Sequence, residues 1–136
     1  MKVIIRKIKH SDYLKIIDLY NETYHKNIMY HDINTTDNKI IIVAETDDIM
    51  IGYLEINILK NELENYNYSY ITNIIIRNKY QSESIINLII QACSKISIEN
   101  KCKKIILNIE DNQNFQTYKK QNFKQLNNIV LSKDLV

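Results

Sequence analysis

Residues 71–90 combine two hydrophobic patterns that follow each other along the chain. The stretch ITNIIIRN is an almost continuous apolar run rich in β-branched residues, which is typical of a strand covered on both faces. After a polar turn, apolar residues recur at helical spacing, at Ile85, Ile86, Ile89, Ala92, Cys93 and Ile96. We therefore expect a strand over residues 68–77 and an amphipathic helix over residues 83–100.

Shorter apolar runs predict the remaining strands. Four of these strands cover residues 2–8, 39–45, 50–59 and 104–109. The second and third form a hairpin, because the polar residues Thr46, Asp47 and Asp48 lie between them. A last pair of runs, residues 123–126 and 129–133, flanks Asn127 and Asn128, and this predicts a C-terminal hairpin with a tight turn.

Two or three further helices are expected. Ser11 is a candidate N-cap for a helix that ends at Tyr24. The polar residues 26–38 are assigned to a second short helix, and residues 114–121 to another. Asn122 follows that last helix and suits a left-handed C-cap. The first helix is expected to face the core with Leu14, Ile17, Leu19 and Tyr20.

Composition limits the class of protein. At 136 residues with 45% hydrophobic content, the chain is expected to form one domain, residues 1–136. A net charge of +2, with both signs interspersed, argues against nucleic acid as the main partner. The apolar runs are far shorter than the ~20 residues that span a membrane, so a cytoplasmic protein is expected. Cys93 and Cys102 lack the spacing of a metal site and are assigned as reduced thiols.

The turn over residues 81–86 is a candidate anion site. A strand that turns sharply into a helix presents free N–H groups and the positive end of the helix dipole, which suits a phosphate. The alternative is an ordinary helix start, with Ser82 as N-cap and Glu83 complementing the dipole.

Several motifs in order resemble one family. Residues 81–86, QSESII, stand where the family has Gln/Arg-x-x-Gly-x-Gly/Ala between a strand and a long helix. Asn114 and then residues 118–123, YKKQNF, resemble the family's Asn followed by Tyr-x-Lys-x-Gly-Phe. Residues 5–22 and 39–56 resemble its first strand and helix and its second and third strands. The chain thus resembles the GNAT superfamily of acyl-CoA-dependent N-acyltransferases over nearly its whole length.

This resemblance implies a fold and an activity. The fold is α/β, with a mixed, mostly antiparallel sheet that splays between its fourth and fifth strands and carries helices on both faces. The activity is transfer of an acyl group, most simply acetyl, from acetyl-CoA to a primary amine. The alternative is a catalytically inactive GNAT domain that serves as a binding or dimerisation module.

The same resemblance assigns the cofactor residues. The pantetheine arm would pair with the backbone at Ile74 and Ile76, and Asn114 would contact it or cap the short helix. The pyrophosphate would lie on the turn formed by Gln81, Ser82, Glu83, Ser84 and Ile86. Ser84 and Ile86 stand where the family has small residues, and Glu83 adds a negative charge beside the phosphates, so we expect weakened binding.

Two residues are catalytic candidates. Tyr118 matches the family tyrosine that gives a proton to the departing thiolate, or it packs in the core. The family often places a glutamate where this chain has Thr72, and Glu55 in the third strand is the nearest substitute as base. The alternative for Glu55 is a place on the solvent face of its strand.

Self-association is expected through the C-terminal hairpin. That hairpin would leave an uncovered edge strand, and a two-fold pairing with a second copy would satisfy both edges. Lys124 and Lys133 weaken this case, because lysines on an edge strand oppose pairing. We therefore expect a homodimer formed through residues 123–133.

Overall fold

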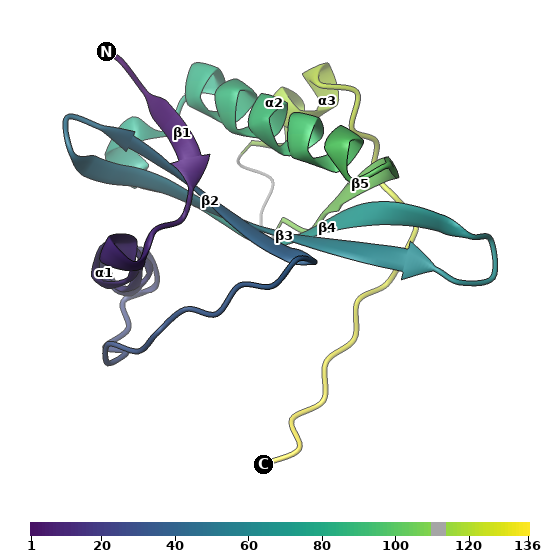
Figure 1. Cartoon of the computed structure of the whole chain (residues 1–136), viewed down its shortest axis with the longest axis horizontal. Helices are drawn as coiled ribbons and strands as arrows, with labels where there is room; N and C mark the ends of the chain where they lie inside the picture. Colours follow the sequence, from purple (N-terminus) through teal and green to yellow (C-terminus); the bar gives the residue numbers. More distant parts are fainter. Residues whose placement is uncertain (110–113) are drawn as a thin grey trace.

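The computed structural model describes residues 1–109 and 114–136. Its strands form one five-stranded sheet (Figure 1). The strand order follows the chain, and the first four strands pair antiparallel while the fourth and fifth pair parallel. The predicted mixed, mostly antiparallel sheet is therefore confirmed. Its strands are β1 (Ile4–Lys7), β2 (Lys39–Thr46), β3 (Ile49–Asn61), β4 (Tyr66–Ile76) and β5 (Cys102–Leu107).

Helices cover both faces of this sheet, as predicted. Helix α1 (Tyr13–Tyr24) packs on one face against residues such as Ile41, Val43 and Tyr53. Helices α2 (Glu83–Glu99) and α3 (Phe115–Lys120) lie on the other face (Figure 1). There the alternate residues of the same strands, including Ile42 and Leu54, form the larger core cluster. The alternation of the strands thus gives each face its own apolar layer.

The chain enters α1 through an ion-pair cluster. Arg6 of β1 donates two hydrogen bonds to the Asp12 carboxylate, at 2.7 and 2.9 Å, and a third to Glu45 at 3.1 Å. Asp12 also accepts the N–H of Lys9 at 2.7 Å. The predicted N-cap Ser11 is therefore wrong, because residues 10–12 form a 3-10 turn and the N-cap position of α1 is Asp12.

Other corrections concern the flanks of α1 and β2. Leu14 points to solvent, since α1 buries Ile16, Ile17 and Leu19 instead. Residues 26–38 form no helix. Their chain is held by local contacts, of which the Asn21 side chain binding both the N–H and C=O of Ile28 is the clearest. The β2–β3 hairpin is confirmed, with Asp47 and Asp48 both in left-handed conformations that suit its tight turn.

The predicted C-terminal hairpin is wrong. Residues 124–136 have no secondary structure, and Figure 1 shows them running away from the sheet. A tight-turn signal alone gives two short strands no neighbour to pair with, and an isolated hairpin is marginal in water. The homodimer stays a prediction that needs a different structural basis. Within the described residues, no helix is long and apolar enough to cross a membrane.

A bulge in β4 shapes the site region. Glu55 of β3 lies opposite Asn73, and the next pair is Ile56 with Ile71, so Thr72 is the extra residue. As a result Thr72 and Asn73 both point to the α1 face, where Asn57 and Glu55 are their hydrogen-bond partners. Just beyond, β4 and β5 part. Their described pairing ends at Ile71 with Leu107, as the predicted splay requires.

Candidate active site

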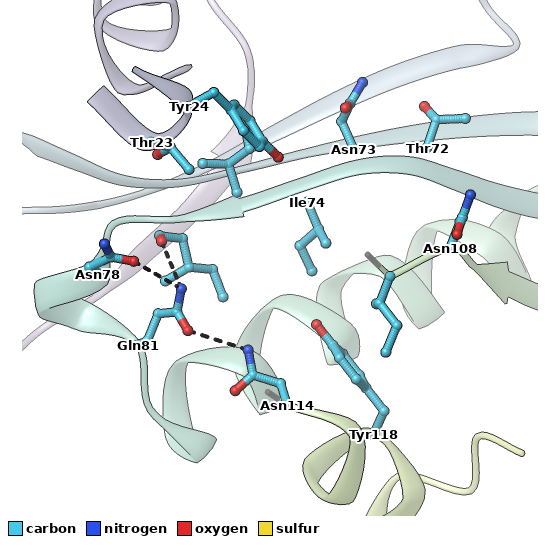
Figure 2. Close-up of a pocket in the computed structure, with 13 residues that line it drawn as sticks. Thr23, Tyr24, Thr72, Asn73, Ile74, Asn78, Gln81, Asn108, Asn114 and Tyr118 are labelled. Atoms are coloured by element: carbon cyan, nitrogen blue, oxygen red, sulfur yellow. Dashed lines mark hydrogen bonds between the residues drawn. The ribbon is translucent and has the colours of Figure 1, made fainter. Parts of the chain in front are cut away.

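Where β4 and β5 separate, the described residues line a cavity of about 280 Å³, called here the β4–β5 pocket. Residues 72–76 of β4 form one wall. Gln81, Asn114 and Tyr118 come from the opposite side, and Thr23 and Tyr24 from the end of α1. Figure 2 shows these side chains around the gap. The cofactor candidates Ile74, Ile76, Gln81 and Asn114 thus line one cavity together with Tyr118. The candidates Ser82, Glu83, Ser84, Ile86 and Glu55 do not line it.

Gln81 ties the pocket together. Its Nε2 donates to the carbonyl of Ile76 at 3.3 Å and to Asn78 at 3.4 Å, and its Oε1 accepts from Asn114 at 3.4 Å (Figure 2). Asn114 occupies the N-cap position of α3, but among the described residues its side chain bonds to Gln81 rather than to the helix start. The Gln81 and Asn114 pair therefore joins the end of β4 to α3 across the pocket.

The start of α2 has the features of both interpretations given above. Ser82 is its N-cap, and its hydroxyl accepts the N–H of Ile85 at 3.2 Å. The first N–H groups of a helix have no intrahelical acceptor, so those of Glu83 and Ser84 remain for another partner. Ser84 is exposed and presents only a small side chain there. The Glu83 carboxylate is paired with Lys120 of α3 at 3.3 Å, which offsets its negative charge.

Ile86 has a different place from the other residues of the turn. Its side chain is fully buried in the core between α2 and the sheet. Its N–H donates to the carbonyl of Ser82 at 3.1 Å. Both groups thus have partners inside the protein, and the branched side chain does not stand in the way of a ligand at the turn.

Ile74 and Ile76 lie on the β4 wall of the pocket, beyond the end of the described pairing with β5. Their side chains pack toward the α2 face, Ile76 as a buried member of the core cluster and Ile74 as a half-buried neighbour. The backbone on this side of β4 has no strand partner in the described chain after Ile71. A ligand with amide groups would find an extended backbone to pair with.

Tyr118 is 95% buried in α3 yet lines the pocket. Its ring packs edge-on against Phe123, with ring centroids 6.0 Å apart. Figure 2 shows the hydroxyl directed into the pocket toward Ile74. The ring of Tyr118 therefore packs in the core while its hydroxyl faces the pocket, and its role as proton donor stays a prediction.

A second cavity of about 420 Å³ lies on the α1 face, called here the α1-side pocket. Glu55 lines it, with a side chain only 14% exposed, so the solvent-face alternative for Glu55 is wrong. Its carboxylate accepts from Tyr53 at 3.0 Å and from Asn73 at 3.2 Å, and pairs with Lys39 at 3.3 Å. Burial, with Glu55 nearby, raises the pKa of Tyr53, which keeps that phenol protonated as a donor.

Asn73 and Ile75 line both pockets, so the two cavities adjoin across β4. Sequence reasoning missed Asn73, Lys39 and Tyr53 as partners of Glu55. The only signal for Asn73 was a polar residue inside an apolar run. No signal marked the other two, because their contact with Glu55 depends on strand register. Among the described residues, no group of three or more potential metal ligands occurs.

Comparison with known proteins gives a family match over most of the chain. The model of the acetyltransferase (GNAT) family matches residues 5–123. None of the curated proteins matches the chain.

Solved structures resemble this one over nearly their full length. They include a transcriptional regulator from Bacillus halodurans C-125, with a TM-score of 0.82 and 14% identity over 98% of this chain and 100% of that chain. Glucosamine-6-phosphate N-acetyltransferase from Arabidopsis thaliana has a TM-score of 0.79 and 17% identity, and the match covers 100% of both chains. Ribosomal-protein-alanine N-acetyltransferase from Brucella melitensis biovar Abortus 2308 has a TM-score of 0.77 and 12% identity, and the match covers 99% of this chain and 100% of that chain.

At these identities the structural likeness establishes the fold alone, whereas the family match covers most of the sequence. Together with the gap between β4 and β5, it shows that the chain belongs to the GNAT acetyltransferase family.

Proposed function

We propose that this protein transfers an acetyl group from acetyl-CoA to a primary amine. The observation that carries this proposal is the contact between two pockets across β4. The β4–β5 pocket holds Tyr118 and four of the candidate cofactor residues, and the α1-side pocket holds the Glu55 carboxylate. A thioester in the first and an amine in the second would meet beside Asn73.

The cofactor would use the backbone of the protein more than its side chains. The pantetheine amides would pair with the unpartnered side of β4 near Ile74 and Ile76, and Asn114 would contact the same arm. The pyrophosphate would lie at the start of α2, on the N–H groups of Glu83 and Ser84. Gln81 would hold β4 and α3 at the separation that this arm needs, since it bonds to both elements.

The reaction needs a base and an acid. Glu55 would take a proton from the substrate ammonium, because a carboxylate accepts a proton where the hydroxyl of Thr72 does not. The neutral amine would then attack the thioester carbonyl. Tyr118 would protonate the departing CoA thiolate, for which a hydroxyl directed into the pocket is suited.

Two measurements test this proposal. Acetyl-CoA at about 100 times its Kd should stabilise the folded chain by ~2.7 kcal/mol, seen as a higher melting temperature. Glu55→Gln should lower kcat on a panel of primary amines while acetyl-CoA still stabilises the protein. Glu62→Gln, which changes an exposed acid beyond the end of β3, serves as the control and should keep wild-type turnover. Equal turnover by all three proteins would remove Glu55 from the mechanism.

A further inference from the structure

Lys39 occupies the position that the proposed mechanism gives to the substrate amine. Its Nζ lies 3.3 Å from Oε1 of Glu55, the candidate base. Lys39 lines the α1-side pocket together with Glu55 and Asn73. Its side chain rises from the first residue of β2 and is 39% exposed, so it has freedom to move within the pocket.

We propose that Lys39 is an internal acceptor and that the protein acetylates itself on Lys39 Nζ. This inference rests on the proposed function, since it uses the same base and the same acetyl donor. It assigns a modification site to a lysine to which the family resemblance gives no role. It also means that an external amine must displace the Lys39 ammonium from Glu55 before it reacts.

The step balances in the same way as transfer to an external amine. Glu55 takes one proton from the Lys39 ammonium, and the neutral Nζ attacks the acetyl carbonyl. The carbon–sulfur bond of acetyl-CoA breaks as the amide bond forms. The CoA thiolate leaves with a proton from Tyr118. The second proton lost from Nζ passes through solvent to restore the Tyr118 phenol, and the proton on Glu55 passes to solvent. The products are acetyl-Lys39, CoA and one proton.

Acetylation would change the pocket. The amide on Lys39 has no charge, so its ion pair with Glu55 is lost and the carboxylate becomes available to another cation. Because the amide nitrogen of acetyl-Lys39 is no longer a nucleophile, self-acetylation would occur once per chain. The α1-side pocket would then hold Glu55 without a resident ammonium.

Lys120 provides a matched control within the same chain. Its Nζ also lies 3.3 Å from a carboxylate, that of Glu83. It differs from Lys39 in lining neither described pocket and in being 67% exposed. Purely chemical acetylation would favour the more exposed lysine, whereas enzymatic self-acetylation would favour Lys39.

The experiment incubates the full chain with acetyl-CoA and no amine, then maps acetylated peptides by mass spectrometry over time. We expect Lys39 to gain one acetyl group at least tenfold faster than Lys120, and Glu55→Gln and Tyr118→Phe each to remove that preference. Equal rates at the two lysines would overturn the inference. A parallel incubation with a panel of primary amines separates the outcomes. Acetylated amine with unmodified Lys39 overturns the self-acetylation alone. The absence of both acetylated products overturns the proposed function as well.

Discussion

Two substitutions at the start of α2, Ile86→Ala and Ser84→Gly, should have opposite consequences although both move the turn toward the family pattern. Ile86 is fully buried and its side chain packs in the core between α2 and the sheet. Ser84 is exposed in the first turn, beside the N–H groups proposed to hold the pyrophosphate. The structure therefore predicts that Ile86 contributes to stability and Ser84 limits cofactor approach.

The magnitudes follow from burial. Truncating a fully buried isoleucine to alanine costs about 2–5 kcal/mol, because transfer and cavity contributions add. For a chain of this size that lowers the melting temperature by roughly 10 °C. Ser84→Gly removes a Cβ and a hydroxyl at an exposed position and costs less than about 1 kcal/mol of helix propensity. It should tighten acetyl-CoA, since the phosphates can approach the backbone more closely.

Urea denaturation measures the first effect and calorimetry with acetyl-CoA measures the second. Ile86→Ala should lose stability without a gain in affinity, and Ser84→Gly should gain affinity with little loss of stability. The reasoning is refuted if Ile86→Ala unfolds within about 0.5 kcal/mol of wild type, the range of an ordinary surface substitution. Tighter acetyl-CoA binding by Ile86→Ala would also refute it, because that would place the side chain at the turn rather than in the core.

Three further predictions concern Tyr118, Glu83 and Asp12. Tyr118→Phe should lower kcat by roughly 10²–10⁴-fold with the Kd for acetyl-CoA unchanged, and an equal loss of binding would indicate a packing role. Glu83→Gln should release Lys120 toward the phosphates, so the affinity for acetyl-CoA should rise at low salt but not at about 1 M salt. A rise in affinity that does not depend on salt would contradict this. The hydrogen bond from Arg6 holds the pKa of Asp12 below its usual 3.8, so its contribution to stability is present above that value and is lost as pH falls through the lower folded pKa. Asp12→Asn should therefore lower the free energy of unfolding by about 3 kcal/mol at pH 7, and it should reduce the further loss of stability as the pH falls. An unchanged loss of stability in acid would exclude this ion pair as its cause.

Local patterns of the sequence were sufficient to predict β4, α2 and the start of that helix. The apolar run and the helical spacing over residues 71–96 predict both elements, and the structure confirms Ser82 as N-cap. Asn122 is also confirmed in a left-handed conformation after α3. These features depend on neighbouring residues, whose preferences can be read from sequence spacing.

Features that depend on distant residues could not be predicted. The contacts of Glu55 with Lys39 and Asn73 join three strands and require the register of each. The C-terminal hairpin had a favourable turn signal but lacked a neighbouring strand, which a local pattern cannot supply. Ile86 fitted both the cofactor motif and the apolar stripe of α2, and only its burial in the folded chain decides between them.

The most direct test of acetyl transfer follows an isotope-labelled acetyl group from acetyl-CoA to a primary amine. The account predicts labelled amide product, with one CoA released for each amide formed, and a rate that falls strongly in both Glu55→Gln and Tyr118→Phe. A folded protein that acetyl-CoA stabilises, but that forms no labelled amide with any amine of the panel and none on itself, would contradict the account. That result would assign the chain instead to a catalytically inactive GNAT domain that binds without transfer.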